Sequence, residues 1–171
     1  AKNLDKKESL IKAKEIRSIS LKHGVKFIVN DSLDIAINSD ADGIHIGKTD
    51  NSFSSVRKEI GNDKIIGVSC YGDLDRCRKY ADLGADYIAI GTPYFTKTKP
   101  DRKKTTLNKM KEIVDKIEST PIFAIGGIDN SNLLEIMKVG VDGVAVINSV
   151  FAANNPKEAT LALVDIINKG V

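Results

Sequence analysis

Short apolar runs rich in β-branched residues recur along the chain and predict six buried β-strands. The runs are continuously apolar rather than alternating, which is typical of parallel strands that are covered on both faces. Between them, apolar residues recur at spacings of three and four, as in the segment 107–117, and this period predicts helices. The predicted strands lie at residues 27–29, 43–46, 65–68, 87–90, 122–125 and 143–147.

A weak internal repeat marks the start of three of these strands. Residues 40–47 (DADGIHIG) are echoed by residues 84–91 (GADYIAIG) and by residues 140–147 (GVDGVAVI). Each copy is typical of a helix C-cap that turns directly into a strand. The repeat therefore supports one βα unit used several times along the chain.

Repeated βα units fit either an open doubly wound sheet or a closed barrel, and periodicity alone does not choose between them. Both architectures place their chemistry after the carboxyl ends of the strands, and in a barrel all such positions converge on one mouth. Polar residues follow every predicted strand, at Asn30–Asp31, 47–50, Ser69, Gly91 onward, Gly126–Gly127 and Asn148. We therefore expect an α/β protein of the (β/α)8 TIM-barrel class.

Such a barrel has eight strands, and the chain shows two fewer. It opens with a charged segment that leads into an amphipathic helix from Leu10 to Leu21. We therefore expect residues 1–171 to form a single (β/α) barrel domain from which about the first two strands are absent.

Composition restricts the class of protein more than its chemistry. With 171 residues and 42% hydrophobic content, the chain can bury one sizeable core. Lys and Arg number 26 against 23 Asp and Glu, so no global field points to nucleic acid or to a membrane. No apolar run approaches the roughly 18 residues needed to span a bilayer, and the opening AKNLDKKESL is too polar for a signal peptide.

Cysteine use fits a reduced compartment. Cys70 and Cys77 are the two cysteines, and neither belongs to a C-x-x-C pair. We expect a cytoplasmic protein whose partners are small molecules rather than nucleic acid or membrane. The sequence leaves the oligomeric state open, with a homo-oligomer among the options.

Two carboxylates follow neighbouring predicted strands and suggest a metal site. Asn30 and Asp31 come directly after one strand, and Asp50 follows the next. Hard oxygen ligands suit Mg²⁺, which typically keeps several waters and shares a substrate phosphate. The alternative is that Asn30 or Asp31 caps the following helix, because Asx residues favour N-caps. For Asp31 taken alone the two interpretations are evenly matched.

A basic loop and a pair of glycines suggest phosphate binding. Residues 96–104 (TKTKPDRKK) combine hydroxyls and cations, which suit multiply charged phosphates, although the part from Arg102 to Lys104 is more typical of a solvated face. Gly126 and Gly127 would let backbone N–H groups approach an anion, with Ile147–Asn148 completing a barrel phosphate cradle. The alternative is that the two glycines only relieve a tight turn.

Single polar residues carry weaker signals. A lone serine such as Ser69 more often caps a helix than binds a ligand. His23 precedes Gly24 at a predicted helix end and is expected to be structural. His45 lies within a predicted strand, where a buried, hydrogen-bonded histidine is more common than a catalytic one.

Taken in order, these motifs resemble those of the thiamine phosphate synthase family. The resemblance runs from about residue 2 to about residue 153 and is carried by FIVND at 27–31, ADGIHIG at 41–47 with Asp50, IGVS at 66–69, TKTK at 96–99 and AIGGI at 124–128. It implies a barrel enzyme that joins a pyrimidine diphosphate to a thiazole phosphate with Mg²⁺, giving thiamine phosphate and pyrophosphate. The implied chemistry needs no protein nucleophile.

The same resemblance implies a role for each matching residue. Asp31 and Asp50 would hold the ion, and Lys99 and Ser69 would be the catalytic residues on the diphosphate side. The implied substrate-binding residues are Lys2, Asn30, Ser69, Thr96, Lys97, Thr98, Lys99, Gly127, Ile147 and Asn148.

The chain departs from the family pattern at three places. A serine is usual where Asn148 stands, and a histidine is usual where Tyr71 stands. Only Lys2 matches a Gln-x-Arg-x-Lys string that grips the pyrimidine, so a chain that truly began at Ala1 is expected to be inactive.

Two other functions remain as alternatives. The sister family of thiazole tautomerases shares the barrel, but the resemblance would place a catalytic histidine directly after Gly91, where this chain has Thr92. The other alternative is a noncatalytic barrel that binds a phosphorylated metabolite in the same mouth.

Overall fold

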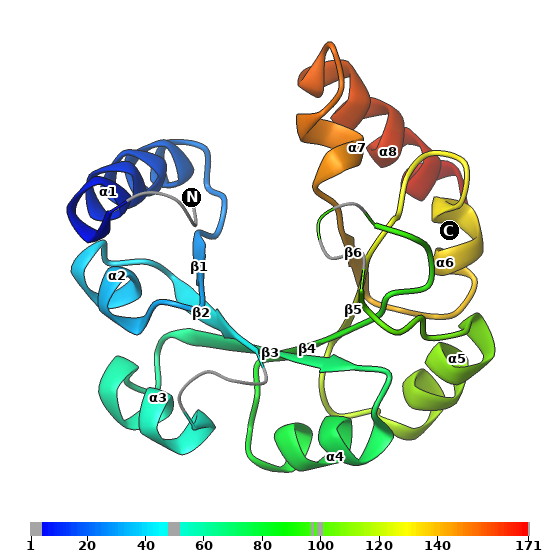
Figure 1. Ribbon diagram of the computed structural model, residues 1–171, viewed down its shortest axis with the longest axis horizontal. Coiled ribbons are helices and arrows are strands. Elements are labelled where there is room, and N and C mark those ends of the chain that lie inside the picture. Colours follow the sequence, from blue (N-terminus) through cyan, green and yellow to red (C-terminus); the bar gives the residue numbers. More distant parts are fainter. Residues whose placement is uncertain (1–4, 48–51, 97, 99–100, 171) are drawn as a thin grey trace. The chain divides into compact units, whose positions relative to one another are not determined.

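The computed structural model describes residues 5–47, 52–96, 98 and 101–170. In this part of the chain, strands and helices alternate for most of the length (Figure 1). The chain divides into two compact units, residues 1–69 with Leu83–Asp86, and Cys70–Asp82 with Tyr87–Val171. The elements are α1 (Lys6–Lys22), β1 (Ile28–Asn30), α2 (Leu33–Asn38), β2 (Gly43–Ile46), α3 (Phe53–Ile60), β3 (Ile65–Tyr71), α4 (Leu74–Asp82), β4 (Tyr87–Ile90), α5 (Leu107–Lys116), β5 (Ile122–Ile125), α6 (Leu133–Met137), β6 (Gly143–Ala145), α7 (Asn148–Phe151) and α8 (Pro156–Gly170).

In the first unit, β1 pairs in parallel with β2, and β2 pairs in parallel with β3. Helix α1 (Lys6–Lys22) has Asp5 as its N-cap, and the Asp5 carboxylate accepts the Glu8 N–H at 2.8 Å. The helix starts earlier than the predicted Leu10, and His23 caps its C-terminal end, as the sequence predicts. It packs against α2, beside which it lies in Figure 1. Ile44 and Ile66 are fully buried in the core of this unit, so the continuous apolar runs are explained by helix cover on the sheet.

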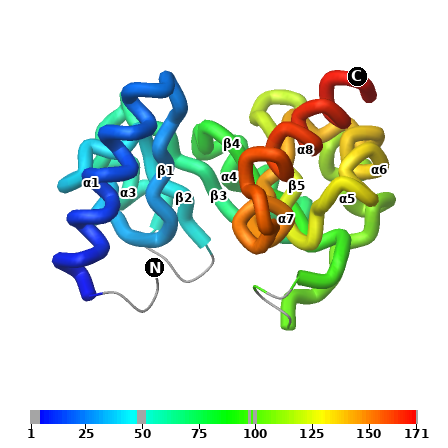
Figure 2. The backbone as a smooth tube through the Cα atoms, turned by 90° about the horizontal axis from the view of Figure 1, so that it is seen from above, coloured from blue at the N-terminus to red at the C-terminus, as the bar shows by residue number. Residues whose placement is uncertain are grey.

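In the second unit, β4 pairs in parallel with β5, and β5 pairs in parallel with β6. The C-terminal helix α8 packs against α6 and α7 (Figures 1 and 2). The buried side chains of this unit include Ile90 and Ile122 from the strands and Ile113 from α5. Cys70 and Cys77 are both buried and free of disulfide bonds.

The internal repeat has a structural cause at the amino ends of the strands. In each copy an aspartate accepts a hydrogen bond from a backbone N–H of the preceding strand segment, and its own N–H donates to the carbonyl of that same residue. The carboxylate–amide pairs are Asp42 with Phe27 at 2.9 Å, Asp86 with Ile66 at 2.8 Å and Asp142 with Ile122 at 2.7 Å. The repeated Asp therefore joins one strand to its neighbour and sets their register.

The predicted strands are all present, and the fold is α/β with parallel strand pairs. The strands at 87–90 and 122–125 match the prediction residue for residue. The strand predicted to end at Val68 continues to Tyr71, and the last strand ends at Ala145 rather than at Ile147. The eight-stranded barrel stays a prediction.

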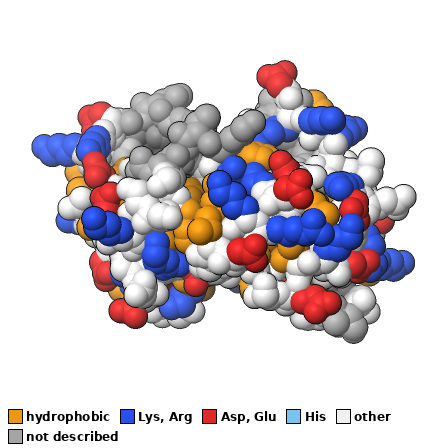
Figure 3. Space-filling model, turned by 90° about the horizontal axis from the view of Figure 1, so that it is seen from below, with side chains coloured by type: hydrophobic (Ala, Val, Ile, Leu, Met, Phe, Trp, Pro, Cys, Tyr) orange, Lys and Arg blue, Asp and Glu red, His pale blue; other side chains and the backbone are white. Residues whose placement is uncertain are grey.

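The surface agrees with the small net charge of +3. On the face displayed in Figure 3, basic and acidic side chains are intermingled rather than separated by sign. None of the helices in the described ranges is long and apolar enough to cross a membrane.

Candidate functional site

The carboxyl end of β1 presents an amide and a carboxylate. Asn30 is the last residue of the strand and is exposed. Asp31 follows with φ at +67°, and its N–H donates to the carbonyl of His45 at 2.9 Å. Helix α2 has Ser32 as its N-cap residue, so neither Asn30 nor Asp31 caps it. The helix-capping alternative for Asp31 is therefore wrong. The carboxyl group of Asp31 is exposed, and its backbone has a left-handed conformation that is uncommon for residues other than glycine.

A histidine and a serine meet between β2 and β3. His45 Nε2 and Ser69 Oγ lie 2.8 Å apart, and both residues are half-buried. Ser69 is inside β3 rather than after it, so the prediction that it follows its strand is wrong, and so is the helix-capping alternative. The strand continues because the N–H of Gly91 donates to the carbonyl of Tyr71 at 2.8 Å.

The contact between His45 and Ser69 follows from the register. His45 pairs with Gly67, and Ser69 stands two residues further on the same face of β3. Because Gly67 has no side chain, the imidazole can reach along the strand to the hydroxyl. Sequence reasoning treated the two residues separately, and the glycine opposite His45 was the signal that joins them.

The loop that follows β4 is fastened at its base. Thr105 is buried; its hydroxyl donates to the carbonyl of Gly91 at 2.9 Å, and its N–H donates to the carbonyl of Thr92 at 2.9 Å. Gly72 makes room for this threonine, since a Cβ there would lie 2.4 Å from Thr105 Oγ1. These two hydrogen bonds hold the start of the loop, Gly91 and Thr92, beside its end at Thr105.

The candidate phosphate-binding residues of this loop lie between those fixed ends. The N–H of Thr98 donates to Thr96 Oγ1 at 3.3 Å, which joins the two threonines locally. Lys103 and Lys104 are exposed, as a solvated face should be. Arg102 differs, because it is half-buried and its guanidinium carbon lies 4.3 Å from the centroid of the Tyr71 ring. The solvated-face prediction is therefore wrong for Arg102.

The double glycine is required by close approach of the chain to itself. Gly126 and Gly127 have φ of +116° and +68°. A Cβ on Gly126 would lie 1.7 Å from Thr92 Oγ1, and one on Gly127 would lie 2.4 Å from the Phe95 carbonyl oxygen. The glycines place the start of the basic loop against the end of β5. Their role in a phosphate cradle stays a prediction.

A tyrosine in the same loop is tied to helix α6. The Tyr94 hydroxyl donates to Glu135 Oε2 at 2.5 Å. Partial burial, followed by this carboxylate, raises the pKa of Tyr94 to about 12. The phenol therefore stays protonated at neutral pH and keeps the loop joined to α6.

The end of β6 carries the remaining candidates. Ile147 is the N-cap residue of the four-residue helix α7, and Asn148 is the first residue of that helix. The Ile147 side chain is 48% exposed, and Asn148 is also exposed. Asn148 follows the carboxyl end of β6, as the sequence predicts, whereas Ile147 was predicted to end that strand and lies beyond it.

The rest of the predicted site cannot be placed beside these residues. Lys2, Asp50, Lys97 and Lys99 lie outside the described residues. Over the ranges that the structure describes, no group of three or more His, Cys, Asp and Glu could hold a metal ion.

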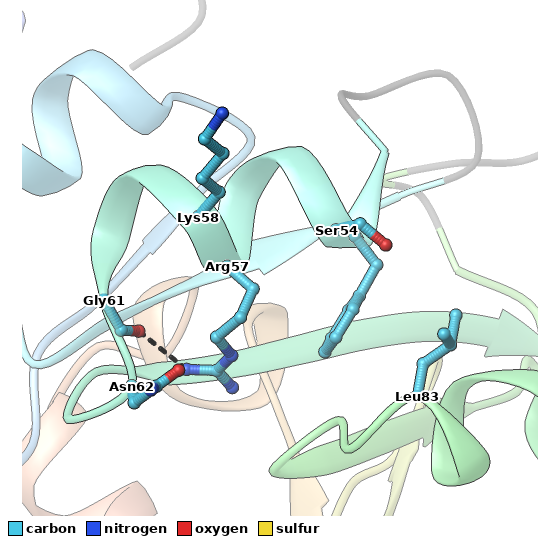
Figure 4. Close-up of a pocket in the computed structure, with 7 residues that line it drawn as sticks. Ser54, Arg57, Lys58, Gly61, Asn62 and Leu83 are labelled. Carbon is cyan, nitrogen blue, oxygen red and sulfur yellow. Dashed lines mark hydrogen bonds between the residues drawn. The ribbon is translucent and has the colours of Figure 1, made fainter.

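The first unit has a pocket whose lining includes none of the predicted site residues. It is a hollow of about 460 Å³ beside α3 (Figure 4). Arg57 in this pocket is committed to structure, since it donates to the carbonyls of Gly61 at 3.0 Å and Lys64 at 2.6 Å and pairs with Asp86 at 2.6 Å. The lining residues are Phe53, Ser54, Arg57, Lys58, Gly61, Asn62 and Leu83. The pocket therefore belongs to the packing of α3.

Comparison with known proteins decides the family. The model of the family described as thiamine monophosphate synthase matches residues 1–150. The chain belongs to the thiamine monophosphate synthase family. This membership confirms the resemblance drawn from the ordered motifs.

Relatives of the thiamine monophosphate synthase family share about two residues in five with this chain. The thiamine-phosphate synthase of Clostridium botulinum is 40% identical over 157 residues, which cover 92% of this chain and 73% of the relative. The thiamine-phosphate synthase of Picrophilus torridus is 41% identical over 156 residues, covering 91% and 75%.

Solved structures agree with the family and extend the likeness of fold. The thiamine phosphate pyrophosphorylase of Pyrococcus furiosus superposes with a TM-score of 0.92 at 32% identity, covering 100% of this chain and 81% of that one. The orotidine 5'-phosphate decarboxylase of Pyrococcus horikoshii has a TM-score of 0.69 at 17% identity, covering 91% and 80%. The second likeness shows a shared fold alone.

Proposed function

We propose that this protein joins a pyrimidine diphosphate to a thiazole phosphate, giving thiamine phosphate and pyrophosphate with the help of Mg²⁺. The observation that carries the proposal is the family match over residues 1–150, together with synthases that are about 40% identical over most of the chain. The described part of the site supports it, because Asn30 and Asp31 stand at the carboxyl end of β1 and Asn148 follows the carboxyl end of β6.

Mg²⁺ fits the residues of this site by the chemistry of its donors. Asp31 offers an exposed carboxylate at the end of β1, and Mg²⁺ is commonly bound through one or two carboxylates, several waters and a substrate phosphate. Asp50 is the second proposed ligand and lies outside the described residues. When bound, the ion would supply positive charge to the departing pyrophosphate.

The residues of the chain do the positioning. Lys99 is proposed to neutralise charge on the leaving group, and Ser69, held by His45 at 2.8 Å, is proposed to donate a hydrogen bond on the same side. Thr96 and Thr98 are proposed to bind the thiazole phosphate. The bond between the pyrimidine methylene carbon and the diphosphate oxygen breaks, and a bond from the thiazole nitrogen to that carbon forms.

The thiazole nitrogen supplies the electron pair of the new C–N bond, and pyrophosphate leaves with the electron pair of the broken C–O bond. The reaction therefore needs no nucleophile from the protein, and the contact between Ser69 and His45 is proposed to bind substrate rather than to activate a serine.

The tautomerase alternative is not favoured. The position after Gly91 is Thr92, which is buried and whose hydroxyl lies 3.4 Å from the carbonyl of Ile125. The curated relatives given above are synthases.

The direct experiment is to supply both phosphorylated substrates and to follow thiamine phosphate and pyrophosphate together, with Mg²⁺ and after its removal by a chelator. We expect equal amounts of the two products, formed only with the metal. Binding of thiamine phosphate without turnover would instead support the noncatalytic alternative, and proton exchange on the thiazole substrate alone would support a tautomerase.

A further inference from the structure

We propose that Tyr71 and Arg102 form a loop latch that holds the basic loop, residues 92–105, in the position from which it binds phosphate. The proposal rests on the function proposed above and deepens it, because it adds two positioning residues that act through that loop.

The first observation is the contact itself. The guanidinium carbon of Arg102 lies 4.3 Å from the centroid of the Tyr71 ring, well within the roughly 6 Å range of a cation–π interaction. Both side chains are half-buried, so water screens the attraction less than it would on an open surface. Arg102 stands in the returning limb of the loop, and Tyr71 is the last residue of β3.

The second observation is that Tyr71 is held firmly. Its backbone has φ of +60°, an uncommon conformation for a bulky residue, and its carbonyl accepts the N–H of Gly91 at 2.8 Å. Arg76 of α4 lies 5.8 Å from the same ring, which adds a second cation to its surroundings. The Tyr71 ring is therefore a fixed surface against which the Arg102 side chain can pack.

The third observation is the arrangement of fixed points along the loop. Thr105 fastens the base to Gly91 and Thr92, and Tyr94 fastens the outgoing limb to Glu135. The contact of Arg102 fastens the returning limb, three residues after Lys99 in the sequence. Without it, residues 101–105 would lose a contact that ties them to a strand.

Placement matters in this reaction because charge stabilisation depends on where the cation lies. A displacement of about 1 Å in a positioning element can cost on the order of a hundredfold in rate. The latch is one of several fixed points, so we expect a smaller effect, about tenfold in kcat/KM.

The test compares four single variants and one double variant with the wild-type protein in steady-state assays and in hydrogen exchange of backbone amides. Tyr71→Asn removes the ring, and asparagine tolerates the left-handed backbone conformation. Arg102→Gln removes the cation. Tyr71→Phe keeps an aromatic face, and Lys103→Gln is the control, because it removes an exposed cation next to Arg102 in the sequence and leaves the latch intact.

We expect Tyr71→Asn and Arg102→Gln each to lower kcat/KM about tenfold and to speed amide exchange within residues 92–105. The double variant should be no worse than either single one, because both remove the same contact. Tyr71→Phe and Lys103→Gln should stay near the wild-type values in both measurements.

Unchanged exchange in the loop, or single effects that add fully in the double variant, would overturn the latch. A loss of activity confined to Arg102→Gln would overturn it as well, since Arg102 would then act without Tyr71. If the wild-type protein formed no thiamine phosphate, the proposed function would fail, while loop exchange would still decide whether the latch exists.

Discussion

Aspartates stand at both ends of the strands, and the two ends use them differently. At the amino ends, Asp42, Asp86 and Asp142 each accept a backbone N–H of the neighbouring strand segment. At the carboxyl end of β1, Asp31 is exposed and the following helix does not use it as a cap. Aspartate therefore joins neighbouring strands at their amino ends, and at the carboxyl end of β1 an aspartate is proposed to hold a metal ion.

The electrostatic surroundings of Asp42 show how firmly the amino end is built. The backbone N–H of Phe27, then Lys26 and Arg17, hold the pKa of Asp42 below its usual range, although desolvation opposes them. Its side chain is 14% exposed, and Arg17 Nη1 lies 2.6 Å from its Oδ2. Such a carboxylate is committed to stability, which agrees with the division of labour between strand ends in barrel enzymes.

The largest expected effect lies at the carboxyl ends. Asp31→Asn and Asp50→Asn should each abolish Mg²⁺-dependent synthesis, because asparagine lacks the carboxylate that each residue is proposed to offer to the ion. Asp31→Asn should leave the free energy of unfolding unchanged, because Asp31 is exposed and asparagine tolerates its left-handed backbone conformation. Product formation across a Mg²⁺ titration is the measurement. Wild-type activity of either variant at low Mg²⁺ would show that the metal assignment is wrong.

The next effect separates two lysines of one loop. Lys99→Ala should lower kcat by on the order of a hundredfold or more, because a cation aimed at leaving-group charge acts mainly in the transition state. Lys103→Ala, which removes an exposed charge nearby in sequence, should change kcat little. Equal losses in the two variants would mean that the loop acts as a diffuse positive field.

At the amino ends the expected effect is on stability. Asp42→Ala should lower the free energy of unfolding by about 2 kcal/mol, because it removes a charged hydrogen-bond acceptor and leaves the Phe27 N–H without that partner. Urea denaturation measures this loss, and kcat per folded molecule should stay at the wild-type value. A large fall in kcat with no loss of stability would reverse the assignment of the two ends.

The smallest effect is a dependence on pH. The folded-state pKa of Asp42 lies below its unfolded value of about 4, so its contribution is fully present above that pH and is lost as the pH falls through the folded pKa. The stability difference between wild type and Asp42→Asn should therefore be constant near neutral pH and shrink below about pH 4. A difference that grew on acidification would contradict the lowered pKa.

The sequence predicted the strands because buried parallel strands leave continuous apolar runs. The predicted strand ends differ from the structure where the polarity of a residue does not match its place in the sheet. Ser69 is polar but lies inside β3, and Ile147 is apolar but lies beyond β6. The repeated aspartates were seen as turns, because the pattern does not reveal which distant N–H a carboxylate accepts.

The sequence predicted which residues belong to the candidate site, but it did not predict which of them contact one another. The meeting of His45 with Ser69 depends on strand register, and the contact of Arg102 with Tyr71 joins a loop to a strand end. The charge run at residues 102–104 does not reveal that Arg102 packs on the Tyr71 ring, so the sequence predicts a solvent-exposed Arg102. Long-range contacts of this kind become visible only once the strands are paired.

The most direct test of the account compares Asp31→Asn with Asp42→Asn, two isosteric changes at opposite strand ends. The quantity to measure is the initial rate of thiamine phosphate formation per folded molecule, with the folded fraction taken from urea denaturation of each variant. The account predicts that Asp31→Asn loses the reaction at an unchanged denaturation midpoint, whereas Asp42→Asn keeps the reaction at a lowered midpoint. An active Asp31→Asn protein, or an inactive but fully stable Asp42→Asn protein, would contradict it.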